Sequence, residues 1–183
     1  MRADAQRNYD RLLEEARQAF IVHGTDVALE DIARHAGVGI GTLYRHFPDR
    51  SALMSAVFVR ELDALNERAQ ELLTADDPAA ALFAWLKAVA AHSTVYRGMS
   101  AQIIGDSDGR MTLCKTRLHE AGRALLARAQ AEGAVRSDAS MSDLLKLTSG
   151  LVLIAEKNPE DLQTFDRLMN LAVNGILVPG GQA

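Results

Sequence analysis

Apolar residues recur every three or four positions along most of this chain, with polar and charged residues between them. The first such stretch runs from Ala5 to His23, and its apolar positions are Tyr9, Leu12, Leu13, Ala16, Ala19 and Phe20. This spacing matches the 3.6-residue turn of an α-helix and predicts an amphipathic helix with one buried face. Gly24 predicts the end of that helix, because glycine readily takes the left-handed conformation that closes a helix.

The same pattern predicts helices through the rest of the chain. Two short helices are expected from Leu29 to His35 and from about Ile40 to His46, and a long one follows over about 50–73. Later helices are expected from Pro78 onward and over 111–132, 141–157 and 160–177. Ser140 or Ser142 would be the N-cap of the helix over 141–157. A less regular stretch, interrupted by glycines, covers 96–108. Since no segment reads clearly as a β-strand, the expected fold class is all-α, with about nine helices.

Composition narrows the class of protein. The chain has 183 residues, of which 48% are hydrophobic and 24% charged, which suits a small folded domain joined to a larger one. It holds no apolar run near the ~20 residues that cross a bilayer. Cys114 is its single cysteine, which excludes an intrachain disulfide and a multi-cysteine zinc site. We therefore expect a cytoplasmic protein that has no contact with membranes.

Charge by itself does not indicate a nucleic-acid partner. The net charge is −4, and residues 1–60 carry eight basic and eight acidic side chains, which sum to zero. A DNA-binding surface would need a local positive field. The segment 34–50 offers a small basic patch with Arg34, Arg45 and Arg50 against Asp49 alone.

Residues 28–47 contain two short helical segments on either side of a glycine turn. Ile32, Ala33, Val38 and Leu43 are spaced to pack against one another, and Gly37 supplies the backbone freedom of a tight turn. This arrangement predicts a helix-turn-helix. The exposed side of its second helix would carry polar and basic residues that can bond phosphates or base edges, namely Thr42, Tyr44, Arg45 and His46.

The same residues resemble a known family. Ile32-Ala33, Ala36-Gly37-Val38, Gly41-Thr42-Leu43-Tyr44, His46-Phe47 and Leu53 are similar in order and spacing to the DNA-binding domain of the TetR family, and the resemblance covers about residues 6–65. It implies a three-helix DNA-binding domain over 1–50. It also implies a helical ligand-binding and dimerisation domain over 51–183, starting with the connecting helix of about 50–73. The function implied is a bacterial transcriptional regulator, most often a repressor. Such a protein binds a palindromic double-stranded DNA operator as a homodimer and is released by a small-molecule effector.

The resemblance also implies the DNA contacts. Tyr44 and His46 would bind phosphates, Thr42 would contact phosphate or base, and Arg50 would anchor a phosphate. Gly41 would let the recognition helix approach the groove closely.

Four positions need separate comment. Arg45 could reach a guanine edge or a phosphate, and Ile40 could contact a thymine methyl or nothing at all. Gly39 and Ala28 stand where the family often has helix-capping side chains, and each missing cap would cost about 1 kcal/mol of local stability.

The C-terminal half has two sets of candidate residues. The ligand-pocket candidates lie on the central helices and are Trp85, Val89, His92, Tyr96, Met99, Met111, Cys114 and Leu118. The dimer-interface candidates lie on the last two helices and are Leu144, Leu147, Leu151, Ile154, Phe165, Leu168, Met169, Ala172 and Ile176. Each set could instead fill the core of a single chain, and Cys114 could be a small core hydrophobe or a redox sensor.

Other classes of protein fit the sequence less well. A helical ligand-binding module of the same fold without sequence-specific DNA binding is the main alternative, because the N-terminal segment is neutral and two caps are missing. An all-helical enzyme lacks a catalytic constellation such as Ser-His-Asp or a Walker loop. The glycine series that ends at Gly41 follows a helix and not a strand, which argues against a dinucleotide loop. No cofactor or metal is expected, since His23, His92 and His119 are scattered.

Overall fold

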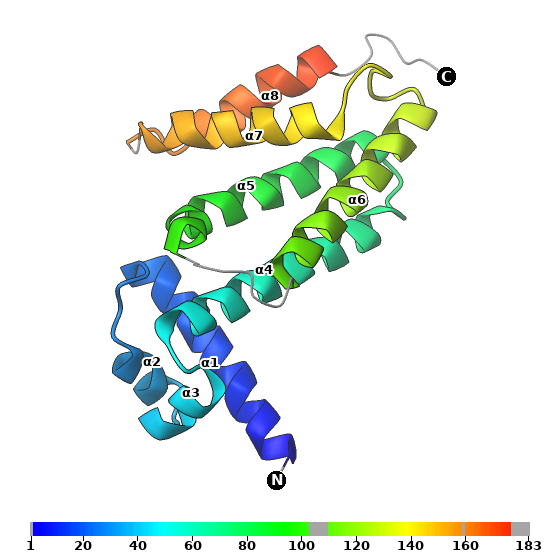
Figure 1. Cartoon of the computed structure of the whole chain (residues 1–183). Helices are drawn as coiled ribbons and strands as arrows, with labels where there is room; N and C mark the ends of the chain where they lie inside the picture. Colours follow the sequence, from blue (N-terminus) through cyan, green and yellow to red (C-terminus); the bar gives the residue numbers. More distant parts are fainter. Residues whose placement is uncertain (1, 103–109, 159, 177–183) are drawn as a thin grey trace. The chain divides into compact units, whose positions relative to one another are not determined.

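The computed structural model describes residues 2–102, 110–158 and 160–176, and these residues form eight α-helices (Figure 1). The helices are α1 (Arg2–His23), α2 (Leu29–His35), α3 (Ile40–His46), α4 (Arg50–Leu72), α5 (Pro78–Gln102), α6 (Arg110–Ala131), α7 (Met141–Glu156) and α8 (Thr164–Ile176). The predicted all-α class is confirmed. None of the described helices is both long enough and apolar enough to cross a membrane.

The helix count differs from the expected nine for one local reason. The stretch from Tyr96 does not form a separate element, because α5 continues without a break as far as Gln102. Gly98 lies inside this helix and does not end it. A glycine inside a helix costs only about 1 kcal/mol, which a long helix with a buried face can absorb. The other end of that stretch, residues 103–109, lies outside the described residues.

The last helix also differs from the sequence prediction. It begins at Thr164 and not at residue 160, so Leu162 lies in the preceding turn, where it is 90% exposed. Asp161 organises this turn, since its carboxylate accepts a hydrogen bond from the Gln163 backbone (3.2 Å) and pairs with Arg167 (2.8 Å). Hydrogen bonding to Arg167 is the main reason why the pKa of Asp161 falls to about 2.

Three helices start on side-chain caps that follow from local sequence. The Ser140 hydroxyl accepts a hydrogen bond from the Asp143 backbone (3.2 Å), which confirms Ser140 as the N-cap of α7. Asp49 caps α4 and Asp77 caps α5 in the same way. Their carboxylates accept hydrogen bonds from the backbone N–H groups three residues further along the chain, at 2.8 and 2.9 Å. Such caps satisfy donors that the first turn of a helix leaves free.

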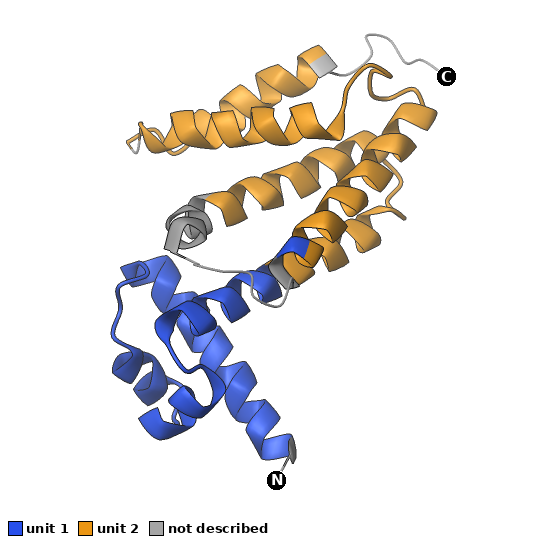
Figure 2. Cartoon of the chain, viewed as in Figure 1, with its two compact units in different colours: residues 1–61, 95–112 blue, residues 62–94, 113–183 orange. Residues whose placement is uncertain are grey.

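The chain divides into two compact units (Figure 2). Residues 1–61 with 95–112 form unit 1, and residues 62–94 with 113–183 form unit 2. This division between residues 61 and 62 falls within α4. The domain boundary expected at residue 50 stays a prediction. The most deeply buried side chains of unit 1 include Leu12, Ile32, Leu43, Leu53 and Met54.

Trp85 is the centre of the core of unit 2. Its side chain is 0% exposed, and the indole Nε1 donates a hydrogen bond to the Leu65 carbonyl at 3.0 Å. Leu82, Leu86 and Leu125 are equally buried. A buried indole needs an acceptor for its N–H, and Trp85 finds one on α4, which gives this residue a role in the core.

Candidate nucleic-acid interface and ligand pocket

The helix-turn-helix of unit 1 is formed by α2, α3 and the turn between them. Gly37 has a φ of +67°, which confirms the predicted turn and is a conformation that other residues adopt only with strain. The Gly37 N–H bonds the Arg34 carbonyl and the Val38 N–H bonds the Ala33 carbonyl, at 3.1 and 3.0 Å. This pair of bonds closes α2 in the manner of a Schellman motif. Leu43 is 0% exposed and anchors α3 in the core.

The expected capping defects are present. Neither Ala28 before α2 nor Gly39 before α3 supplies a side-chain hydrogen bond to its helix. The short helices are held by burial instead, chiefly of Ile32, Ala33 and Leu43. The structure thus tolerates the missing caps.

The outer face of α3 carries most of the predicted DNA contacts. Ile40 is 37% and Tyr44 45% exposed, and Gly41 and Arg45 are exposed as well. Thr42 is half-buried. Leu43 points inward and leaves Tyr44 and Arg45 outside, as the spacing of the motif predicts. This face can offer a phenol, a guanidinium and a methyl-bearing hydroxyl side chain to DNA.

His46 is less available than its position suggested. Its ring packs edge-on against Tyr9, with centroids 5.8 Å apart, and lies 6.2 Å from the ring of Phe47. The Nε2 atom is buried and has no hydrogen-bond partner among the described residues. A phosphate contact from His46 would therefore have to use Nδ1, and His46, like Thr42, is half-buried.

Arg50 has a structural role that the sequence did not reveal. Its Nη1 donates to the carbonyls of Thr25 and Val27, at 2.6 and 2.7 Å, and so ties the loop between α1 and α2 to the start of α4. A phosphate contact would have to use Nε or Nη2. Arg34 is also engaged, since it pairs with Asp31 at 2.5 Å. Arg45 is accordingly the arginine of the basic patch best placed to contact DNA.

The predicted ligand-pocket residues differ in burial where the structure describes their side chains. Val89 and Cys114 are buried in unit 2, as Trp85 is, and His92 and Leu118 are half-buried. Burial lowers the pKa of His92 to about 4. The side chains of Tyr96, Met99 and Met111 lie outside the described residues.

Described residues of unit 2 form two pockets whose linings contain none of the predicted pocket residues. One, of about 560 Å³, lies between α4 and α6 and is lined mainly by polar side chains. The other, of about 390 Å³, is lined mainly by apolar groups of α5, α7 and the turn before α8. One sequence signal could have located the first pocket: Asn66 interrupts the apolar stripe of Leu62, Leu65 and Ala69 on α4.

The dimer-interface candidates fall into two groups. Leu144, Leu151 and Met169 are at most 8% exposed and fill the core of the chain itself. Leu147 and Ile154 are 39% and 47% exposed on α7. Phe165, Leu168 and Ala172 are half-buried, and the side chain of Ile176 lies outside the described residues. The exposed apolar residues Leu153 and Leu171, at 50% and 67%, were not predicted.

Comparison with known families gives two matches in separate segments. Residues 12–57 match bacterial regulatory proteins of the tetR family. Residues 77–178 match the C-terminal domain of SbtR-like transcriptional regulators. The first match includes the helix-turn-helix, and the second extends from α5 to α8.

Known proteins similar to this chain include two solved structures. The TetR transcriptional regulator SCO0520 from Streptomyces coelicolor is 32% identical, with a TM-score of 0.78 over 93% of this chain and 99% of that one. The TetR transcription regulatory protein from Mycobacterium vanbaalenii is 30% identical, with a TM-score of 0.75 over 97% and 99%. An HTH-type transcriptional regulator of Staphylococcus aureus (strain USA300) is 44% identical over 64 residues, which are 34% of this chain and 35% of that protein. The chain thus matches about a third of the length of this curated relative.

Proposed function

Because the chain belongs to the TetR family of bacterial DNA-binding transcriptional regulators, we propose that it is a cytoplasmic repressor that binds a palindromic operator as a homodimer and leaves it when a small effector binds. The observation that carries this proposal is the outer face of α3. Buried Leu43 holds the helix in place, and Tyr44 and Arg45 are exposed beside it. An arginine at such a position can bond a guanine edge or a phosphate.

Dimerisation would follow from the last two helices. Leu147 and Ile154 on α7 and Leu171 on α8 are exposed although they are large and apolar. Covering such residues with a second copy of the chain would remove apolar area from water. A twofold dimer would also present two recognition helices to the two half-sites of a palindrome.

Effector control would act through a difference in affinity. An effector that binds one conformation of the protein more tightly than another shifts the population toward it. If that conformation holds the two recognition helices out of register with the half-sites, the operator is released.

Operator binding is tested with fluorescence anisotropy on labelled DNA from the promoter region beside the protein's own gene. Tyr44→Ala and Arg45→Ala are each expected to weaken binding by about 5- to 100-fold, because each removes a contact to phosphate or base. Arg123→Ala is the matched control, since Arg123 is exposed on α6 and its loss changes the net charge equally. The proposal fails if the protein shows no preference for this DNA over random DNA at any salt concentration.

The dimer is tested separately, by sedimentation at micromolar protein concentration. Leu171→Glu places a charge in the proposed interface and is expected to convert the dimer into monomer. Leu113→Glu, at a residue of α6 that is 59% exposed, is the control and should leave the dimer intact. A wild-type protein that sediments as a monomer would refute the dimer.

A further inference from the structure

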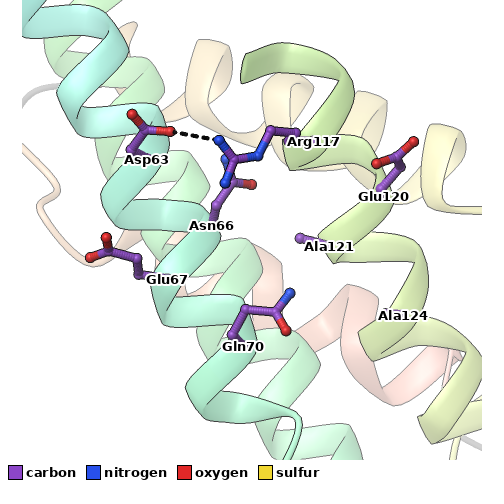
Figure 3. A pocket seen from close by; sticks show the side chains of 8 residues that line it. All are labelled: Asp63, Asn66, Glu67, Gln70, Arg117, Glu120, Ala121 and Ala124. Carbon is purple, nitrogen blue, oxygen red and sulfur yellow. Dashed lines mark ion pairs between the residues drawn. The ribbon is translucent and has the colours of Figure 1, made fainter. Parts of the chain in front are cut away.

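The pocket between α4 and α6 lies wholly within unit 2 and is polar (Figure 3). Asp63, Asn66, Glu67 and Gln70 line it from α4, and Arg117, Glu120 and two alanines line it from α6. Its volume of about 560 Å³ is within the range of small-molecule sites. In Figure 3, Asn66 and Gln70 lie on the side of α4 that faces α6.

Asn66 is the unusual residue of this pocket. Its side chain is only 6% exposed, yet neither its amide nitrogen nor its amide oxygen has a hydrogen-bond partner in the described part of the chain. A buried amide without partners destabilises a fold, and the great majority of buried polar groups in proteins are paired. Leucine would fit the apolar stripe of α4 better. The asparagine therefore indicates a partner from outside the chain.

The amide group defines what this partner must offer. A carboxamide presents its acceptor oxygen and one donor N–H side by side on a single edge, so its natural complement has a donor beside an acceptor. Another carboxamide has this edge, and so does an amino-heterocycle such as adenine, whose N6 and N7 pair with an asparagine or glutamine side chain. Gln70 supplies a second carboxamide in the same pocket.

The charges of the lining restrict the partner further. Asp63, Glu67 and Glu120 are acidic and Arg117 alone is basic, which leaves a net charge of −2 (one positive minus three negative). Arg117 is partly neutralised, because its Nη1 lies 3.5 Å from the Asp63 carboxylate. Like charges repel, so an anionic ligand is disfavoured and a neutral or cationic one is preferred.

From these observations we infer that the α4–α6 pocket binds a small neutral or cationic molecule whose carboxamide or amino-heterocycle edge pairs with Asn66. This inference names the chemistry of the effector and rests on the effector control proposed above. The binding event itself involves no DNA. It can therefore be tested on the protein alone.

The test uses three named probes and one anionic counterpart. Nicotinamide, adenine and cytosine each carry a donor beside an acceptor, and nicotinate replaces the carboxamide of nicotinamide by a carboxylate. The melting temperature of the full chain is measured with each compound at millimolar concentration. At about ten times its Kd, a probe should raise the melting temperature by about 3–6 °C. At least one of the three is expected to do so, and nicotinate is expected to have no effect.

Variants distinguish pairing with Asn66 from a purely structural role. Asn66→Leu should abolish the response to the probe and, without ligand, raise the melting temperature, because an unpaired buried amide is removed. Gln18→Leu makes the same kind of exchange at an exposed position of α1 and should respond like the wild type. Gln70→Leu, at an exposed lining residue, should weaken the response without changing a buried position.

Four results would overturn the inference: no probe raises the melting temperature, nicotinate raises it as much as nicotinamide, the response of Asn66→Leu equals that of the wild type, or Asn66→Leu melts lower than the wild type without ligand. Because the assay contains no DNA, each of these results leaves operator binding by α3 untouched. Conversely, a protein that binds a probe but no operator would refute the proposed repressor and keep the pocket.

Discussion

Gly122 on α6 offers a sharp test of how the core of unit 2 is packed. A Cβ atom added at this position would lie 2.6 Å from Cη2 and 2.7 Å from Cζ3 of Trp85, and 3.0 Å from the sulfur of Met141. Carbon atoms in contact normally lie about 3.5–4.0 Å apart. The Gly122→Ala substitution therefore forces an overlap of about 1 Å onto the indole ring.

The sign of the effect depends on two opposing contributions. Alanine favours the helix over glycine by about 1 kcal/mol. Overpacking a close-packed core costs about 1–3 kcal/mol. Trp85 cannot move aside freely, because it is fully buried and its Nε1 is bonded to the Leu65 carbonyl; losing that bond would cost about 1 kcal/mol more. We expect a net loss of about 2 kcal/mol in the free energy of unfolding.

Urea denaturation followed by far-UV circular dichroism measures this change. Gly150→Ala on α7 is the control, since a Cβ there meets nothing within 4 Å and the helix should gain stability. Trp85→Phe supplies the second arm of a double-mutant cycle, because the smaller ring leaves room for the added methyl group. The reasoning is refuted if Gly122→Ala is as stable as the wild type, or if its cost is unchanged in the Trp85→Phe background.

Three other substitutions test His92, Arg50 and Gly41. Burial lowers the pKa of His92 from 6.5 to about 4, so the unfolded chain binds the proton more readily between these values. The stabilisation by neutral His92 is then complete above about pH 6.5 and lost as the pH falls to about 4. This stabilisation amounts to up to about 3 kcal/mol. The free energy of unfolding of His92→Gln, measured by urea denaturation, should therefore depend less on pH between 4 and 6.5 than that of the wild type. An equal dependence on pH would contradict this prediction. Arg50→Ala should lower the free energy of unfolding by about 2–3 kcal/mol, because it leaves the carbonyls of Thr25 and Val27 without their hydrogen-bond donor. Weaker DNA binding at unchanged thermal stability would instead assign Arg50 to phosphate contact alone. A Cβ atom at position 41 would have no atom within 4 Å, so Gly41→Ala should stabilise α3 by up to about 1 kcal/mol. The same methyl group should weaken operator binding in the anisotropy assay, because it lies on the face of α3 that approaches the groove. Tighter DNA binding would exclude close approach of this helix to the groove.

Much of the local structure could be predicted from the sequence. The helix-turn-helix, the left-handed turn at Gly37 and the cap at Ser140 depend on hydrogen bonds between residues three to five positions apart. Such bonds are specified by short stretches of sequence. Helix ends were less certain, as α5 and α8 show, because a glycine or a polar residue weakens a helix without always ending it.

The order of residues in α3 also predicted which of its side chains are buried and which are exposed. Leu43 is buried and Tyr44 and Arg45 are exposed, as the spacing of the motif required. His46, one residue further on, is half-buried because Tyr9 of α1 packs against its ring. That contact joins residues far apart in the sequence, so periodicity on α3 could not show it.

The sequence by itself thus determined the helices, their turns and the family, because these follow from local hydrogen bonding and from a dense local motif. Only the tertiary structure decided which neighbour covers each apolar or polar position. It placed Leu144 and Met169 in the core but left Leu171 exposed, and it buried Asn66 beside a pocket. An amphipathic pattern shows that a helix has a buried face, but the partner of that face is set by packing between segments distant in the chain.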